Sequence, residues 1–398
     1  MECVIERAPL YASLALLQGV TERRNTVPIL AHILVEAAGE SVKFAATDLE
    51  VGIKTELKCR VKKKGALTVQ ARKFFEVVRE AQADEVSLHS LDNDWIEVGC
   101  GRAKFKMLGL DPRSFPAMPS QDDKPAPSFV EGVAAQPQLG QSTGSAPAES
   151  RPVKGELSID VGVLGALIDK TLFASSPDEA RYNLSGVFVE ASEPGVVRMV
   201  ATDGHRLSMV DRAVEGFTME GGAILPRKGL NELKKLLEQP GESLVRLVLE
   251  GSVGWLKRGV TELSMRLVQG EFPDYRAVLP KSWQHEIALD RDVILSALKR
   301  VAIFSNERYR GIKLALSPGK LLLSSVSPEL GEAEESLEVE FQGEELVAGF
   351  NANYLVQAIS TMPAGEPAVI GLTDDASPAV LMTRGDTQYM CAVMPMRL

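Results

Sequence analysis

Ala-Ala-Thr-Asp at residues 45–48 returns as Val-Ala-Thr-Asp at residues 200–203, an offset of 155 positions. Ala-Arg-Lys at 71–73 returns at the same offset as Pro-Arg-Lys at 226–228. Unrelated landmarks that share one offset indicate an internal repeat rather than chance similarity. The sequence therefore predicts at least two copies of one structural unit.

A third copy is weaker but visible. Gly186 matches Gly311, and Pro226 matches Asn351, both 125 positions later. The repeating unit is therefore about 120 residues long, within the roughly 100–200 residues of an ordinary domain. The 398-residue chain holds three such units, which we expect at residues 1–119, 155–281 and 285–398.

Residues 120–154, between the first two units, differ in composition from the rest of the chain. They are rich in Pro, Ala, Ser, Gln and Gly and nearly free of large apolar residues. A stretch of this kind cannot bury enough apolar surface to fold alone, so we expect a flexible linker. Phe129, Val130 and Val133 leave open a small docking motif within it.

Each unit follows the same order of elements. A short strand leads into an amphipathic helix, alternating strands follow, and a second helix precedes further strands. Pro9 suits a first helical position, and Asp160 and Asp290 suit helix caps. The predicted fold class is α+β, with three repeated domains that each pack two helices on antiparallel sheets. The helices are expected at residues 9–18, 72–82, 161–174, 228–239, 292–304 and 351–362.

The composition is that of a globular protein able to bury a core, with 45% apolar and 25% charged residues. The first residues carry no basic run, so no secretory signal is expected, and no apolar stretch is long enough to predict a membrane span. The four cysteines, Cys3, Cys59, Cys100 and Cys391, lack the spacing of a metal site or a disulfide framework. We expect a cytoplasmic protein without a cofactor or a bound metal.

The net charge of −10 argues against nucleic-acid binding, because phosphate contacts need Lys and Arg. Where the cations lie matters more than their sum, however. Arg72 and Lys73 lie off the apolar stripe of one predicted helix, and Lys228 and Lys235 off that of another. A basic helix face suits phosphate binding without sequence preference. An ordinary solvated helix face remains the alternative.

No catalytic residue is expected. Asp203 and His205 resemble an acid and base pair, but the first repeat has Leu49 and Glu50 where the second has Gly204 and His205. A turn that tolerates this change is structural, with local hydrogen bonds to the Asp side chain as its role. The sequence also lacks a phosphate loop, a nucleophile elbow and any cluster with metal-ligand spacing.

Longer motifs resemble those of the bacterial β sliding clamp family, the processivity subunits of DNA polymerase III. They are Arg-Asn-Thr-Val-Pro-Ile-Leu at 24–30, Ala-Arg-Lys-Phe-Phe at 71–75, Ala-Thr-Asp-Gly-His-Arg-Leu at 201–207, Phe-Pro-Asp-Tyr-Arg at 272–276 and Met-Pro-Met-Arg-Leu at 394–398. The resemblance covers the chain except residues 120–154. It implies three clamp domains per chain and a head-to-tail homodimer that closes a ring around duplex DNA.

The resemblance also implies a non-catalytic function, which is to tether the replicative polymerase to DNA and confer processivity. The implied partners are duplex DNA without sequence preference, a second copy of the chain, the polymerase III catalytic subunit and the clamp-loader ATPase. Other polymerases, ligase and mismatch-repair proteins would bind through short Gln-Leu-Phe-type peptides. The alternative is a clamp-fold scaffold that does not encircle DNA.

Two sets of contact residues follow from the resemblance and from the basic and apolar patterns. DNA contacts are expected at Arg24, Arg72, Arg181, Tyr182, Asn183, Arg227 and Lys228. The resemblance implies two aromatic residues at positions 182 and 183, so Asn183 is expected to stack less on DNA. The dimer interface, with an apolar centre and a charged rim, is expected to comprise Lys73, Arg102, Lys104, Phe105 and Met107 on the first domain and Ile303, Phe304, Glu332, Glu334 and Glu335 on the third.

The resemblance further implies a peptide pocket between the second and third domains. Met394 and Met396 near the end of the chain supply adaptable apolar surface of the kind that accepts varied ligands. Ala277 stands where the family has Arg, which removes one polar contact from the rim. The expected walls are Leu184, Thr202, Gly204, His205, Arg206, Leu207, Pro273, Val278, Tyr354, Val393, Met394, Pro395, Met396 and Arg397.

Overall fold

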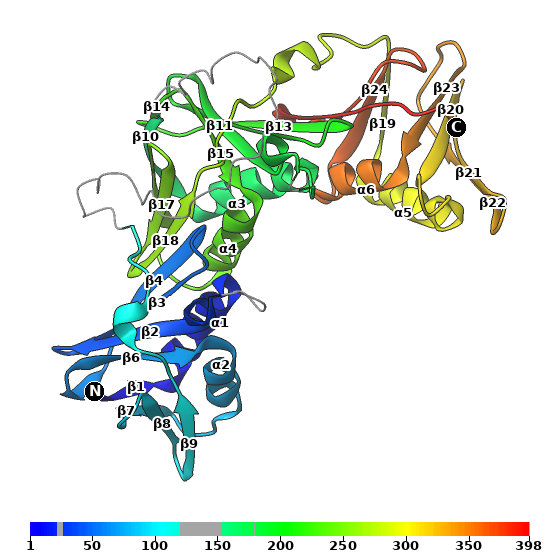
Figure 1. The fold of residues 1–398 in the computed structure, drawn as a ribbon. Coiled ribbons are helices and arrows are strands. Elements are labelled where there is room, and N and C mark those ends of the chain that lie inside the picture. The colour runs from blue at the N-terminus through cyan, green and yellow to red at the C-terminus, as the bar shows by residue number, and fades with distance from the viewer. Residues whose placement is uncertain (22–26, 120–152, 179, 398) are drawn as a thin grey trace, which may run out of the picture. The chain divides into compact units, whose positions relative to one another are not determined.

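A computed structural model describes residues 1–21, 27–119, 153–178 and 180–397. These fall into two compact units (Figure 1), the first from residues 1–154 and 231–266 and the second from residues 155–230 and 267–398. The predicted linker at 120–154, apart from its last two residues, lies outside the described residues, and so does Arg24. No described helix is long and apolar enough to cross a membrane.

The first unit contains helices α1 and α2, one five-stranded antiparallel sheet and seven strands of a nine-stranded sheet. The strands follow the orders β5-β1-β7-β8-β9 and β16-β17-β18-β4-β3-β2-β6. The bounds are β1 (Glu2–Glu6), α1 (Arg7–Val20), β2 (His32–Ala38), β3 (Ser41–Thr47), β4 (Val51–Lys58), β5 (Arg60–Lys63), β6 (Gly65–Gln70), α2 (Ala71–Glu80), β7 (Glu85–Ser90), β8 (Trp95–Cys100), β9 (Ala103–Leu108), β16 (Leu244–Glu250), β17 (Val253–Arg258) and β18 (Thr261–Arg266).

The second unit pairs its strands in the orders β15-β11-β12-β13-β26-β25-β24-β19 and β22-β21-β20-β23. Helix α4 (Arg227–Glu238) runs from the second unit into the first. The remaining bounds are β10 (Lys154–Asp160), α3 (Val161–Thr171), β11 (Gly186–Glu193), β12 (Val196–Thr202), β13 (Arg206–Ala213), β14 (Thr218–Glu220), β15 (Gly222–Pro226), β19 (His285–Asp290), α5 (Arg291–Val301), β20 (Gly311–Ser317), β21 (Lys320–Ser327), β22 (Gly331–Glu338), β23 (Leu346–Asn351), α6 (Ala352–Ser360), β24 (Pro367–Leu372), β25 (Ala379–Thr383) and β26 (Asp386–Val393).

The strands and helices form where apolar residues recur at the matching period. Val42, Phe44 and Ala46 alternate along β3 and are buried, as expected for a strand with one face on the core. Leu10, Leu14 and Leu17 recur at helical spacing along α1 and are fully buried. Each such leucine contributes roughly 1.5–3 kcal/mol through burial, so this buried stripe stabilises the packing of α1 on the rest of its unit.

The predicted helices are all present, with shifted ends. Helix α1 begins two residues before Pro9, which still lies in the first turn, where the backbone N–H has no partner within the helix. The predictions for 161–174 and 292–304 ran past α3 and α5 into the 3-10 turns Leu172–Ala174 and Ala302–Phe304. Asp160 and Asp290 cap their helices as expected, and Asp160 accepts from the Gly162 N–H at 2.8 Å.

The repeat is present in the strand pairing itself. Gly186 pairs with Pro226 between β11 and β15, and Gly311 pairs with Asn351 between β20 and β23. In both copies the second helix begins at the next residue, as α4 and α6 respectively. The match of Gly186 to Gly311 and of Pro226 to Asn351 is therefore confirmed at the level of hydrogen-bonded register.

The Thr-Asp turns are structural, as predicted. Asp203 accepts hydrogen bonds from the backbone N–H groups of His205 and Arg206 at 3.0 and 3.1 Å. Asp48 does the same for Glu50 and Val51 at 2.9 and 2.7 Å. Each carboxylate thus holds a tight turn between two strands, which explains why it occurs in both repeats.

Successive repeats join edge to edge. Strand β4 of the first repeat pairs antiparallel with β18 of the second, and β13 of the second pairs antiparallel with β26 of the third. Strands β4, β13 and β22 begin 155 and 125 positions apart, the two offsets of the repeat. Among the described strands, β22 and β9 each have a free edge.

Candidate functional site

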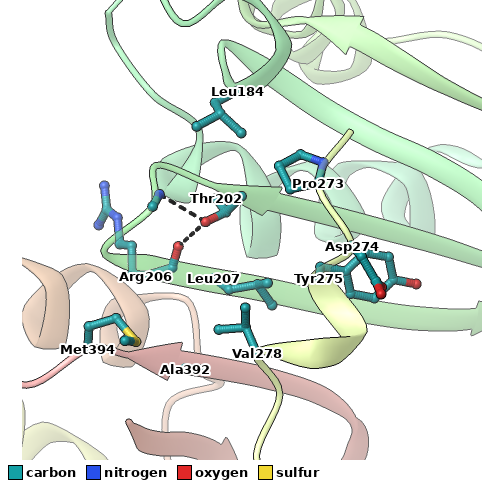
Figure 2. Close-up of a pocket in the computed structure, with 11 residues that line it drawn as sticks. Leu184, Thr202, Arg206, Leu207, Pro273, Asp274, Tyr275, Val278, Ala392 and Met394 are labelled. Carbon is teal, nitrogen blue, oxygen red and sulfur yellow. Dashed lines mark hydrogen bonds between the residues drawn. The ribbon is translucent and has the colours of Figure 1, made fainter. Parts of the chain in front are cut away.

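A small cavity of about 130 Å³ opens on the second unit (Figure 2). Its walls come from the end of β12, the start of β13, the loop after residue 271 and the end of β26, and most of the exposed atoms are apolar. The lining residues are Leu184, Thr202, Gly204, Arg206, Leu207, Pro273, Asp274, Tyr275, Val278, Ala392 and Met394.

An aromatic cluster positions the loop that forms one wall. Phe272 stacks on Phe188 with ring centroids 5.0 Å apart, and Tyr275 lies against both rings. The Tyr275 hydroxyl donates to Glu190 and accepts from Arg198 at 3.3 Å. Because this side of the loop is anchored, Val278 is presented at the cavity with 45% of its surface exposed.

Arg206 forms the base of the opposite wall and is only 7% exposed. Its guanidinium donates to Asp203 at 3.1 Å, to the backbone carbonyl of Phe173 at 2.5 Å and to the Gln357 side chain. It also lies 4.4 Å from the centroid of the Tyr354 ring. Arg206 therefore ties α6 of the third repeat to the second repeat behind the cavity.

The end of the chain closes the remaining side. The Met394 backbone N–H donates to the His205 carbonyl at 2.8 Å, and the Met396 N–H donates to the Gly349 carbonyl at 2.8 Å. The Met394 side chain stays partly exposed and lines the cavity. These backbone contacts hold the segment in place while leaving a methionine side chain free to adapt.

Eight of the fourteen predicted pocket residues line this cavity: Leu184, Thr202, Gly204, Arg206, Leu207, Pro273, Val278 and Met394. Tyr354 contacts Arg206 behind it, and His205, Pro395, Met396 and Arg397 do not line it.

Val393 was expected in the wall but is fully buried, and Ala392 lines the cavity instead. Side chains alternate along a strand, so two consecutive residues of β26 cannot both face the cavity. The two-residue period of a strand, counted back from the predicted Met394, could have identified Ala392. Asp274 and Tyr275, which the prediction also missed, directly follow the predicted Pro273.

A second, larger hollow of about 920 Å³ lies in the first unit between α1, α2 and Lys235 of α4. Arg72 and Lys73 line it, together with Arg79 and Lys235, and Glu76 is the one anion in the lining. Arg72 and Lys73 bind Glu76 at 3.0 and 2.8 Å, but their side chains stay 70% and 62% exposed. Hydrogen bonds from Lys73 and then Arg72 lower the pKa of Glu76. The hollow is basic and polar.

The other predicted DNA contacts lie in the second unit and are partly engaged. Arg227 donates to the Ser175 carbonyl and hydroxyl, both at 3.0 Å, and Arg181 donates to the Asp203 carbonyl at 3.0 Å. Asn183 donates to the Glu271 carbonyl at 3.2 Å. Tyr182 is exposed and Lys228 half-buried. No sequence pattern indicated these local partners.

The predicted interface residues lie mainly on and beside the edge strands β9 and β22. On β9, Phe105 and Met107 pair with the buried Val98 and Ile96 of β8, so they share the face that packs on the core. Lys104 and Lys106 point to the other face. On β22, Glu332 and Glu334 are exposed, while Glu335 turns to Arg300 at 2.9 Å. Ile303, Phe304 and Arg102 are exposed, and Lys73 lies apart on α2.

Models of three protein families match the chain. They are described as the N-terminal, central and C-terminal domains of the DNA polymerase III beta subunit and match residues 1–119, 158–274 and 276–397. No group of His, Cys, Asp and Glu among the described residues could hold a metal ion.

Relatives match over their full length. The beta sliding clamps of Caulobacter vibrioides and Pseudomonas putida are 34% and 33% identical to this chain, with 100% of each chain covered. A crystal structure of the Caulobacter crescentus clamp matches with a TM-score of 0.87 and 34% identity, over 100% of this chain and 99% of that one. The Pseudomonas aeruginosa clamp bound to griselimycin matches with a TM-score of 0.85 and 32% identity, covering 100% of both chains.

Proposed function

The chain belongs to the family of DNA polymerase III β subunits, the bacterial β sliding clamps, and we propose that two copies join head to tail into a closed ring. The chain is a DNA sliding clamp of three clamp domains, a non-catalytic processivity factor of the polymerase. The scaffold alternative is not favoured. We further propose which residues join the two chains, which contact DNA and which bind partner proteins.

The main support for the ring is the strand pairing that joins successive repeats. Strand β4 of the first repeat pairs antiparallel with β18, the last strand of the second repeat. Strand β13 has the place in the second repeat that β4 has in the first, and it pairs in the same way with β26, the last strand of the third repeat. The third join of the series needs β22 and the last strand of a first repeat, β9. Both edges are free in the described chain. In a dimer, β22 of each chain would pair with β9 of the other chain. Two such joins would close the ring.

The chemistry of the two edges supports this pairing. Lys104 and Lys106 lie on one face of β9, and Glu332 and Glu334 are exposed on β22. Phe105 and Met107 lie on the other face, which would meet Ile303 and Phe304. An apolar layer with a charged layer of opposite sign beside it is ordinary interface anatomy. Glu335 contributes less than expected, because Arg300 already neutralises it.

The basic hollow supports DNA binding without sequence preference. Arg72 and Lys73 are exposed cations on α2 that form ion pairs with Glu76. On DNA binding, a phosphate group would take the place of the Glu76 carboxylate. Arg24, Arg181, Tyr182, Arg227 and Lys228 would add contacts, and Asn183 adds little because its amide is already bonded. We place this activity in the cytoplasm.

The cavity in the second unit is proposed as the docking site for short partner peptides. An apolar hollow with a few polar groups at its mouth buries one or two side chains and fixes their orientation. Two such side chains are worth roughly 1.5–3 kcal/mol each before ordering costs, so an isolated peptide should bind with micromolar affinity. The polymerase, the clamp loader, ligase and mismatch-repair proteins would then compete for one site per chain.

The test is calorimetry with a short peptide that contains Gln, Leu and Phe. Deleting residues 394–398 removes Met394 from the wall and should abolish binding while leaving the assembly state unchanged. Val278→Ser should weaken binding about tenfold, since it removes a contact at the cavity. The matched control is Val293→Ser on α5, because Val293 is 48% exposed and does not line the cavity. Equal binding by all four proteins would place the docking site elsewhere.

A further inference from the structure

Two arginines and an exposed tyrosine lie close together in the segment 306–310 of the third repeat, between α5 and β20 (Figure 1). Arg308 and Tyr309 are exposed, and Arg310 is half-buried. The Arg308 guanidinium lies 5.6 Å from the centroid of the Tyr309 ring. Neither arginine forms an ion pair within the described part of the chain. Glu307 is the one anion of the segment, which therefore carries a net positive charge.

The backbone of this segment is anchored. The Arg310 N–H donates to the Asn306 carbonyl at 2.8 Å, and the Arg310 carbonyl accepts from the Ala352 N–H of α6 at 2.7 Å. The Asn351 side chain donates to the Tyr309 carbonyl at 3.3 Å. Because the backbone is already held, a ligand that binds the two arginines meets a smaller ordering cost than it would on a mobile loop.

The second repeat has a corresponding segment at 176–185, and it is anchored in the same way. The Arg227 N–H at the start of α4 donates to the Ser185 carbonyl at 3.2 Å. Arg227 lies 125 positions before Ala352, and Ser185 lies 125 positions before Arg310. The two segments therefore occupy the same place in their repeats, and the second-repeat segment is the one that carries three of the predicted DNA contacts.

The third-repeat arginines are better placed to bind phosphate than their second-repeat counterpart. The Arg181 guanidinium already donates to the Asp203 carbonyl at 3.0 Å. Among the described residues, no oxygen accepts from the guanidinium of Arg308 or Arg310. Arg310 also has a φ of 48°, a left-handed conformation that is uncommon for a residue other than Gly, Asn or Asp. An arginine kept at a conformational cost favours a role for its side chain.

We propose that Arg308 and Arg310 form a further DNA contact, in the third repeat, and bind backbone phosphates without sequence preference. This rests on the proposed DNA binding and adds a site to it. A guanidinium donates two parallel hydrogen bonds to a phosphate. The Tyr309 ring supports the Arg308 guanidinium through a cation–π contact and so limits the orientations that it adopts. Each chain would then contact DNA from all three of its repeats.

The experiment uses the full chain and a short fluorescently labelled DNA duplex, with binding measured by anisotropy over a series of low salt concentrations. The logarithm of the binding constant falls with the logarithm of the salt concentration, with a slope of about 0.9 for each phosphate contact. The double variant Arg308→Gln with Arg310→Asn removes both cations, and Asn suits the left-handed backbone at position 310. Its slope should be shallower by about 1.8, the value for two contacts. Tyr309→Leu should weaken binding about threefold and leave the slope unchanged.

The matched control is Lys313→Gln with Lys320→Gln, which removes the same charge from the same repeat. Lys313 and Lys320 are exposed on β20 and β21. They alternate with the buried Ile312 and Leu321, so they point to the face of the sheet opposite the one that packs on α5. This control should keep the slope of the unmodified protein.

Circular dichroism and the dimer mass establish that each variant is folded and assembled. If the arginine variant keeps the full slope while the unmodified protein binds the duplex, the inference alone fails. An equal loss of slope in both double variants would also overturn it, because the effect would then follow the net charge and not the place of the arginines. If the unmodified protein does not bind the duplex at any salt concentration, the proposed DNA binding fails as well.

Discussion

Asp386 is a carboxylate shared by two cations from the neighbouring repeat. Lys170 of α3 binds it with Nζ 2.5 Å from Oδ2, and Arg212 of β13 binds it at 2.6 Å. Lys170 is buried and also lies 4.7 Å from the centroid of the Tyr389 ring. This triad pins β26 of the third repeat to α3 and β13 of the second, at the opposite end of β26 from the cavity. Removing the carboxylate would leave a buried cation without its partner.

We expect Asp386→Asn to lower the free energy of unfolding at pH 7 by about 3 kcal/mol, the usual cost of breaking a buried pair. Burial raises the pKa of Asp386, but hydrogen bonds from Arg212 and Lys170 outweigh it and hold the pKa below its ordinary value. A depressed folded-state pKa gives stability that is present above the unfolded value of about 3.9 and lost as the pH falls through the folded value.

Urea unfolding at pH 7 and at pH 3 measures both effects. The unmodified protein should lose more stability than the Asn variant over this interval. Asp375→Asn, which neutralises an exposed carboxylate in a turn, serves as the control. If the two variants unfold at the same urea concentration at pH 7, the triad does not stabilise the join.

At this scale the sequence predicted residue types better than residue partners. The capping roles of Asp160, Asp203 and Asp290 follow from local spacing and were predictable. The bonds from Arg227 to Ser175 and from Arg181 to Asp203 join residues 52 and 22 positions apart and follow no period. Only the folded chain shows that these two cations already have protein acceptors.

At the scale of elements, the proposed dimer rests on the edge strands β9 and β22. Charge reversal of Lys104 and Lys106 to Glu should shift the protein from dimer toward monomer, because like charges would then face Glu332 and Glu334. Light scattering over a concentration series measures the shift. Reversing Glu332 and Glu334 to Lys in the same protein should restore the dimer.

The control for this pair lies on the opposite edge of the same sheet. Lys63→Glu with Lys64→Glu changes the net charge equally at the end of β5, which is not part of the proposed join. It should leave the dimer unchanged. If the β9 variant dimerises as well as this control, the chains do not meet at β9.

The sequence predicted the elements themselves well, because their periods are local. It placed all six helices within a few residues of their bounds and aligned β11 with β20 through Gly186 and Gly311. It did not predict that β4 pairs with β18, since that contact joins edges far apart in the chain. The domain limits at 119, 155, 281 and 285 remain predictions, because contacts divide the second repeat between two units.

At the scale of the whole molecule, the segment 120–154 should be dispensable for assembly. The chain is anchored on both sides of it in the first unit, where Lys54 donates to the Met118 carbonyl at 3.2 Å and Gly251 donates to the Val153 carbonyl at 2.9 Å. Replacing residues 120–152 with a Gly/Ser connection should change neither dimer mass nor DNA retention. If a well-folded replacement variant loses either property, the segment docks on the rest of the protein. That result would support the alternative of a docking motif at Phe129, Val130 and Val133.

A ring should hold DNA by topology rather than by affinity. Binding to a short linear duplex should be weak and fall steeply with salt, because it rests on phosphate contacts. Rings loaded onto closed circles should survive the same salt and be lost when the circle is cut, as gel filtration can measure. Tight, sequence-dependent binding to a short duplex would contradict this.

The joins between repeats also govern the order in which the chain can fold. Strand β4 ends at Lys58, but its partner β18 is complete only at Arg266. At a synthesis rate of about 5–20 residues per second, the β4 edge waits roughly 10–40 seconds on the ribosome without its partner. An unpaired edge strand is a template for aggregation during that interval. The features that let the repeats build one continuous assembly thus make the nascent chain dependent on protection until its second repeat has emerged.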